Sequence, residues 1–141
     1  MKQKTYWKEE MKDDLMRIYR EVSQSGWCRN QLEAYEKTVT HPAPRYYVDA
    51  RWAHQRISPM LRGDLTNLDK MNPLTREMYL SLFDVVVRLS RTEKYLDCSI
   101  YELVRNAIMQ PAPRFYISPQ RMGQIFQERR RFTRMKNEKE R

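Results

Sequence analysis

The chain has 141 residues, of which 40% are hydrophobic, and 27 lysines and arginines against 18 aspartates and glutamates give a net charge of +9. This length and composition predict a folded protein with a real core and exclude wholesale disorder. Every apolar run is shorter than the roughly 20 residues that cross a bilayer, and the first residues lack the apolar stretch of a signal peptide. We therefore expect a cytoplasmic protein that does not bind membranes.

The first half of the chain contains three predicted helices. Apolar residues recur at helical spacing over residues 5 to 24, and Gly26 supplies a stop. A second helix begins near Asn30 and ends at Pro42, because the two prolines of "HPAPR" interrupt a helix. The next letters, "RYYV", predict a short strand, and Asp49 then caps a third helix that ends near residue 61.

A stretch with the composition of a linker, residues 62 to 73, precedes three more predicted helices. Asn72 caps the first of them, and its closely spaced apolar residues predict the most buried helix. Ser99 and Glu102 form a capping box at the start of the second. The letters "PAPRFYI" then predict another proline-bounded strand, after which Ser118 caps the last helix.

The two halves of the chain resemble each other. "PAPRYYVDAR" at residues 42 to 51 and "PAPRFYISPQ" at 111 to 120 lie 69 positions apart, and the same shift aligns Asn30 with Ser99. We therefore predict a mainly α fold, a six-helix, bundle-like single domain over residues 1–131. It consists of two tandem helix-helix-short strand-helix repeats, about 5–63 and 72–131, related by pseudo-twofold symmetry. Residues 132–141 are predicted to form a basic C-terminal tail.

The predicted strands carry one set of candidate binding residues. Because strand side chains alternate between faces, Arg45 and Tyr47 share one face, as do Arg114 and Tyr116 in the second copy. Two interpretations of these pairs remain open. In the first, each arginine stacks on an aromatic ring and pairs with a carboxylate, such as Glu33 or Glu102, as a local clamp. In the second, the guanidinium and the phenol together contact a phosphate or a partner.

The C-terminal residues carry much of the positive charge. Residues 129 to 141 contain seven basic and two acidic side chains, so their local charge of +5 is more than half of the net charge of +9. Such a segment is attracted to polyanions, with an affinity that falls steeply as salt is added. A solvated, frayed helix end is the alternative interpretation.

Together these patterns predict a nucleic-acid-binding protein that is not an enzyme, with double-stranded DNA preferred to RNA. A helix, an irregular break and a capped helix are compatible with a helix-turn-helix, although the break is longer than the usual turn. In that geometry the residues offered to base edges and phosphates are Arg51, Gln55, Gln120, Arg121, Gln124, Arg129, Arg130, Arg131 and Arg134. In a variant, the two strands form a β-ribbon that reads the groove through Arg45, Tyr47, Arg114 and Tyr116.

The sequence lacks the usual patterns of catalytic and metal sites, since it contains no glycine-rich phosphate loop, no HExxH, no GxSxG and no paired-cysteine zinc spacing. Cys28, Cys98, His41 and His54 match no standard zinc site, so we interpret them as core or surface residues. We expect no cofactor and no metal. The alternative function is a helical assembly or accessory subunit of a phage or mobile-element complex, which binds a protein partner or further copies of itself, or holds RNA.

Overall fold

The computed structural model describes residues 6 to 139, and the regular structure in this range is helical. This confirms the prediction of a mainly α fold. Within these residues, no helix is both long enough and apolar enough to cross a bilayer. The elements are α1 (Tyr6–Gln24), α2 (Gln31–Val39), α3 (Ala50–Leu61), the short 3₁₀ helix η2 (Thr66–Lys70), α4 (Pro73–Ser90), the 3₁₀ helix η3 (Glu93–Tyr95), α5 (Ile100–Ala107) and α6 (Pro119–Lys139).

Several helices begin where the sequence predicts a cap. The side-chain oxygens of Asn30, Asp49, Asn72 and Ser99 each accept a hydrogen bond from a backbone N–H two or three residues further on. These bonds satisfy amides that have no partner inside the helix. After α1, Gly26 adopts a φ of 74°, a left-handed conformation that favours glycine, and the chain turns toward α2.

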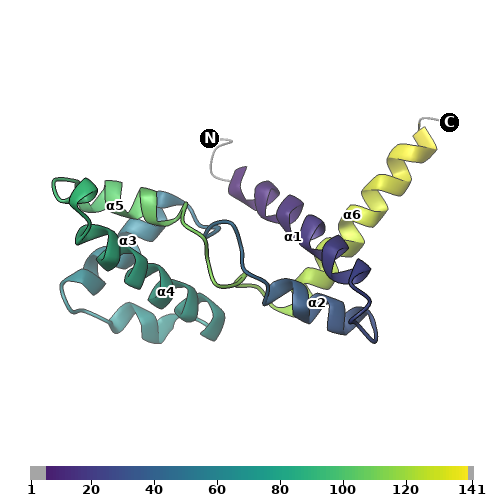
Figure 1. Ribbon diagram of the computed structural model, residues 1–141, viewed down its shortest axis with the longest axis horizontal. Coiled ribbons are helices and arrows are strands. Elements are labelled where there is room, and N and C mark those ends of the chain that lie inside the picture. The colour runs from purple at the N-terminus through teal and green to yellow at the C-terminus, as the bar shows by residue number, and fades with distance from the viewer. Residues whose placement is uncertain (1–5, 140–141) are drawn as a thin grey trace.

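The helices form two lobes (Figure 1). In the first lobe α1 and α2 pack with α6, and in the second lobe α4 and α5 pack with α3. Each lobe therefore combines two helices from one half of the chain with the third helix from the other half. As a result α2 and α3, which follow each other in the chain, lie in different lobes, and so do α5 and α6.

Two extended segments carry the third helices from one lobe to the other. We call residues 42–49 and 111–118 the crossing segments; they lie side by side in the middle of the molecule (Figure 1). They meet at one antiparallel bridge, where the Ala43 N–H donates to the Ala112 carbonyl and the Ala112 N–H donates to the Ala43 carbonyl, both at 2.9 Å. Both alanines are buried, so a larger side chain at this point would have to displace the core.

The crossing segments form no strand, and in this respect the prediction of strands at 45–48 and 114–117 is not confirmed within the described residues. The Tyr46 N–H donates to the Ile108 carbonyl at 2.8 Å, and the Phe115 N–H donates to the Val39 carbonyl at 2.9 Å. These amides therefore bond to the ends of α5 and α2 rather than to each other. The prolines of each segment also lack an N–H, so a ladder cannot extend past the bridge.

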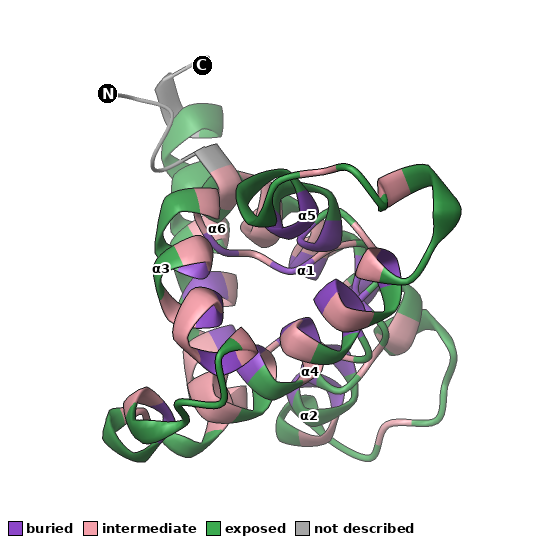
Figure 2. Cartoon of the chain, turned by 90° about the vertical axis from the view of Figure 1, so that its left-hand side faces the viewer, coloured by how far each residue is buried: buried purple, intermediate pink, exposed green. Residues whose placement is uncertain are grey.

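The aromatic rings of the crossing segments belong to the core. Tyr46 is 2% exposed and Phe115 is 1% exposed, as predicted for the apolar face of the segments. The ring of Tyr46 stacks on that of Tyr116 with centroids 6.3 Å apart, and Phe115 stacks on Tyr47 at 5.6 Å. Each pair corresponds to the other by the 69-residue shift. Figure 2 shows the buried residues gathered on the inner faces of the helices.

The predicted linker and the predicted basic C-terminal tail both contain helix. The linker includes η2, whose Leu68 is buried in the core. The predicted C-terminal tail begins inside α6, which runs without a break to Lys139. The last two residues of that tail lie outside the described range. Helix therefore carries the basic residues from Arg129 to Lys136 at fixed angular positions.

Candidate nucleic-acid interface

The structure distributes the predicted binding residues over three places. One group lines a cleft between the lobes, namely Arg45, Tyr47, Arg114, Tyr116 and Arg121. The second group lies on the C-terminal half of α6, namely Arg129, Arg130, Arg131 and Arg134. The remaining residues are exposed at the start of the third helix of each lobe, with Arg51 and Gln55 on α3 and Gln120 and Gln124 on α6.

We call residues 129–137 of α6 the basic segment. It extends away from the first lobe (Figure 1), and its outer turns are exposed (Figure 2). At about 100° of rotation per residue, Arg130, Arg131 and Arg134 lie within an arc of about 100° on one side of the helix. All three side chains are exposed, and they form no ion pair with the side chains of residues 7 to 137. Within that range their charges are not compensated.

A groove of about 1220 Å³ separates the basic segment from α1. Among the described side chains, its lining contains one acidic residue, Asp13, whose carboxylate pairs with Arg129 at 3.0 Å. Phe132, which is 65% exposed, adds an aromatic surface to the groove. The basic residues that line it are Arg20, Arg129, Arg130, Arg134 and Lys136.

Arg129 has a structural role within this group. Its Nη2 atom lies 3.1 Å from Glu9 Oε2 and 3.0 Å from Asp13 Oδ1, and both carboxylates belong to α1. The side chain is about one-third exposed, so the pairs are partly protected from solvent. Arg129 thus attaches α6 to α1 at the point where the basic segment begins, and less of its charge remains for a ligand.

The second candidate surface is a cavity of about 430 Å³ that we call the central cleft. It lies between α1, the first turns of α4 and of α6, and the two crossing segments. Its cationic lining residues are Lys8, Lys12, Arg45, Arg114 and Arg121. Its aromatic lining residues are Trp7, Tyr46, Tyr47, Tyr79 and Tyr116. The fold thus brings together the two arginine–tyrosine pairs that the sequence singles out.

Arg45 forms the local clamp that was one of the two interpretations of its sequence pattern. Its guanidinium lies 5.7 Å from the centroid of the Tyr47 ring, and its Nη1 atom pairs with Glu10 Oε2 at 3.1 Å. The Arg45 side chain is only 11% exposed. The Tyr47 hydroxyl donates a hydrogen bond to Asp14, and burial together with this bond raises the pKa of the phenol. The charge of Arg45 is therefore compensated inside the protein.

Arg114 repeats this stacking without the ion pair. Its guanidinium lies 5.9 Å from the centroid of the Tyr116 ring, and it donates to the carbonyls of Phe115 at 3.1 Å and Ile117 at 3.4 Å. Within residues 6 to 139 it has no carboxylate at ion-pair distance. Burial is the main cause of the raised pKa of Tyr116. The two arginines thus occupy corresponding places but differ in charge compensation.

The described structure contains neither the helix-turn-helix nor the β-ribbon that the sequence suggested. A helix-turn-helix made of α5 and α6 is not formed, because the crossing segment carries α6 into the first lobe while α5 packs against α3 and α4. The β-ribbon is not formed either, since the described residues contain one isolated bridge. Among the proposed base readers, Arg121 bonds to Gln124 at 3.1 Å and to Glu128 at 3.5 Å.

The sequence interpretation missed the basic residues that α1 contributes. Lys8 and Lys12 line the central cleft and Arg20 lines the groove, and the four-residue spacing of the two lysines was a usable signal that they share one helix face. Within the described residues, no three histidine, cysteine or acidic side chains gather in a way that could hold a metal ion. No protein-family model matches the chain, and neither the curated proteins nor the solved structures contain a match to it.

Proposed function

We propose that this protein binds nucleic acid without catalysing a reaction, and that its ligand is double-stranded DNA held by the basic segment of α6. The observation that carries the proposal is the set Arg130, Arg131 and Arg134. These exposed guanidiniums lie on one side of one helix, and no acidic side chain among residues 7 to 137 pairs with them. Three clustered positive charges on a rigid element favour a polyanion over a small ligand or an apolar partner.

The dimensions of α6 suit a duplex. Its 21 residues span about 31 Å at 1.5 Å per residue. A helix about 10 to 12 Å in diameter enters a major groove that is about 12 Å wide. The cationic groove beside the basic segment provides further phosphate contacts, and the exposed Gln120 and Gln124 provide amides that suit base edges.

We further propose that the chain is a duplicated unit whose two copies exchange their third helices about a pseudo-twofold axis. The support is a series of matched contacts 69 positions apart. They comprise the caps Asn30 and Ser99, the amides of Tyr46 and Phe115, and the stacked arginines Arg45 and Arg114. A duplicated unit places α3 and α6 at corresponding positions in the two lobes, and α6 alone carries the long basic extension.

A salt titration tests the proposed function. The full chain is titrated against labelled duplex DNA, single-stranded DNA and duplex RNA by fluorescence anisotropy, between about 50 and 200 mM salt. We expect tightest binding to duplex DNA and a linear, steep fall of log K with log salt, because bound arginines release counterions from the phosphates. A chain that binds none of the three at the lowest salt would refute nucleic-acid binding. A preference for RNA would refute the duplex DNA assignment.

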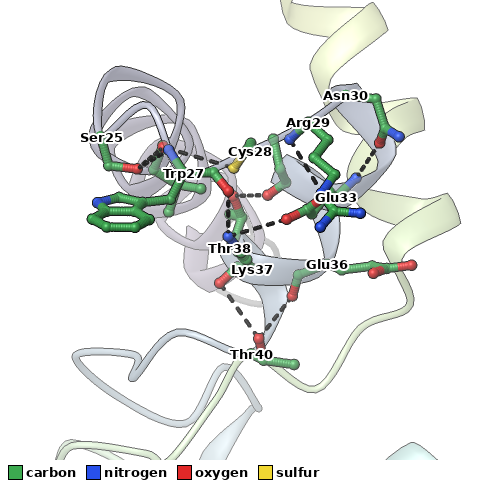
Figure 3. Close-up of polar contacts among 12 residues, drawn as sticks. Ser25, Trp27, Cys28, Arg29, Asn30, Glu33, Glu36, Lys37, Thr38 and Thr40 are labelled. Atoms are coloured by element: carbon green, nitrogen blue, oxygen red, sulfur yellow. Dashed lines mark hydrogen bonds and ion pairs between the residues drawn. The ribbon is translucent and has the colours of Figure 1, made fainter.

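A second candidate function, self-assembly, is favoured by one specific observation. Trp27 is 78% exposed and stands on a turn that is held by hydrogen bonds. The backbone N–H of Trp27 donates to Ser25 Oγ at 3.4 Å, and its backbone carbonyl accepts from Lys37 Nζ at 2.8 Å. The indole ring points away from this network (Figure 3). An apolar ring on an ordered turn is a typical interface anchor.

The second lobe presents an equivalent apolar surface. Leu96 and Tyr101 are exposed at the positions that correspond to Trp27 and Leu32 by the 69-residue shift. Two such surfaces on one chain allow copies to associate end to end. Size-exclusion chromatography with light scattering, over a range of concentrations, should then show a rising mass that Trp27→Ser abolishes. A mass equal to one chain at every concentration would refute this second candidate.

A further inference from the structure

The central cleft contains cationic side chains that are not paired with acidic residues of the described fold. Lys12, Arg45 and Arg121 each form an ion pair with a glutamate. Lys8 and Arg114 form none with the described residues, and the lining of the cleft contains no acidic side chain. A half-buried guanidinium without a counter-charge carries a desolvation cost that an anion would offset. The cleft therefore has the charge of an anion site.

Arg114 retains hydrogen-bond donors for a ligand. A guanidinium has five N–H groups, and two of those on Arg114 bond to the carbonyls of Phe115 and Ile117. Three remain without a partner in the described part of the chain. Because the guanidinium is also stacked on Tyr116, its plane is fixed before a ligand arrives. A fixed planar fork of N–H donors matches the geometry of a phosphate group.

The local charges nearby do not neutralise Arg114. Burial is the main cause of the raised pKa of Tyr116, and Tyr46 and the charge of Glu77, on α4, raise it further. Glu77 forms no ion pair with Arg114, whereas Glu10 does pair with Arg45 at the corresponding place in the first crossing segment. At corresponding places in the two crossing segments, Arg45 is therefore charge-compensated by the described residues and Arg114 is not.

The remaining walls of the cleft favour an aromatic ligand. Five of its lining side chains are aromatic, and Tyr46 stacks on Tyr116 next to the guanidinium of Arg114. Aromatic side chains favour a ligand with a flat ring that can stack on them. The volume of about 430 Å³ lies within the usual range for small-molecule sites.

We propose that the central cleft binds a phosphate monoester that carries an aromatic base, of the size of a nucleoside monophosphate, with its phosphate held by Arg114 and Lys8. This site is separate from the basic segment and goes beyond the DNA-binding function. The same chemistry is offered by a free mononucleotide and by the 5′-phosphorylated end of a nucleic-acid strand. A cleft of about 430 Å³ whose Arg45 is 11% exposed is too small to admit a duplex.

Isothermal titration calorimetry on the full chain with adenosine monophosphate, adenosine and inorganic phosphate tests the proposal. We expect saturable binding of the monophosphate, and at least about tenfold weaker binding of adenosine and of phosphate, because each supplies only part of the contacts. A short strand with a 5′-phosphate and the same strand with a 5′-hydroxyl separate the two sources, because the basic segment binds both strands alike. Tighter binding of the phosphorylated strand assigns the site to strand ends, and equal binding of the two strands assigns it to free nucleotides.

Three variants locate the site. Arg114→Gln should weaken the monophosphate at least about tenfold, and Lys8→Gln, at an exposed position, should weaken it several-fold without affecting the core. Arg105→Gln removes the same charge from an exposed position of α5, outside both candidate surfaces, and should leave the affinity unchanged. If Arg114→Gln does not fold, Lys8→Gln alone decides. Absence of saturable binding below about 1 mM, or equal affinities for wild type, Lys8→Gln and Arg105→Gln, would overturn the proposal.

Discussion

Gly123 offers a direct test of the exchange of third helices between the lobes. This glycine lies inside α6, and a Cβ atom built on it would come within 3.1 Å of Tyr35 Cε2 and 3.5 Å of Tyr35 Cδ2. Tyr35 belongs to α2, in the other half of the chain. Its ring is 9% exposed and packs against Tyr19 and Phe126, with centroids 5.7 and 5.9 Å away, so it cannot move aside freely.

Two opposing effects determine the stability of Gly123→Ala. Alanine favours a helix interior by about 1 kcal/mol over glycine. Overpacking against the Tyr35 ring costs about 1 to 3 kcal/mol. We therefore expect Gly123→Ala to lower the free energy of unfolding by about 1 kcal/mol. In a Tyr35→Leu background the clash is relieved, and the same substitution should stabilise the protein by about 1 kcal/mol, a coupling of about 2 kcal/mol.

Urea denaturation of the wild type, both single variants and the double variant gives this coupling energy. Gln124→Ala, an exposed change in the same helix, is the matched control and should show no coupling with Tyr35. If the halves did not exchange helices, α3 would lie beside α2, and His54 would take the place of Gly123. A stabilising Gly123→Ala with no coupling to Tyr35 would therefore refute the exchanged arrangement.

Three further outcomes follow from the same contacts. Burial and the hydrogen bond to Asp14 raise the pKa of Tyr47 above its ordinary value of 10.0, so the stability that it contributes is complete below pH 10 and is lost as pH rises further. The urea midpoint of Tyr47→Phe should accordingly fall less steeply above pH 10 than that of the wild type; equal slopes would contradict this. Phe115→Ala should lower the free energy of unfolding by about 3 to 5 kcal/mol, because this ring is buried. Phe132→Ala should lower it by less than about 0.5 kcal/mol, because this ring is exposed. Similar losses for the two variants would show that the crossing segments do not organise the core. Asn72→Ala should cost about 1 kcal/mol and Asn72→Asp less, since the aspartate can still cap α4, and equal thermal midpoints for the three proteins would argue against the cap.

Local features of the fold could be predicted from the sequence because they depend on a few neighbouring residues. The caps Asn30, Asp49, Asn72 and Ser99 each need only a side-chain oxygen and an amide two or three positions away, and all four are found. The prolines likewise predict the two breaks, which the structure contains. The predicted strands were not confirmed, because a ladder needs a partner with free donors and the crossing segments meet at one point only.

The exchange of helices between lobes could not be predicted for a different reason. The apolar faces of α3 and α6 correspond, since Ala53 and Ile57 align with Met122 and Phe126. Either helix could therefore pack its apolar face against α2. Sequence pattern alone does not choose between them. The crossing segments decide, because their prolines keep the chain extended and carry the next helix away from the one before it.

The sequence singles out the candidate binding residues but not their surroundings. The two arginine–tyrosine pairs meet in one cleft. That Arg45 is neutralised and Arg114 is not depends on Glu10, which lies 35 residues from Arg45 in the chain and whose contact no local pattern indicates. The availability of Arg130, Arg131 and Arg134 similarly depends on which acidic residues of α1 reach α6, and those residues pair with Arg129 instead.

The central claim is that the basic segment of α6 neutralises phosphates. The most direct measurement is the slope of log K against log salt for duplex DNA, compared between the wild type and two triple variants of equal net charge. Neutralising the three exposed arginines of α6 should reduce the size of the slope by about 2.7, at about 0.9 per phosphate contact, while the control leaves it unchanged. Equal slopes for the two variants would contradict the claim. The test variant is Arg130→Gln, Arg131→Gln and Arg134→Gln, and the control, at exposed positions of α4, its C-cap and α5, is Arg88→Gln, Arg91→Gln and Arg105→Gln.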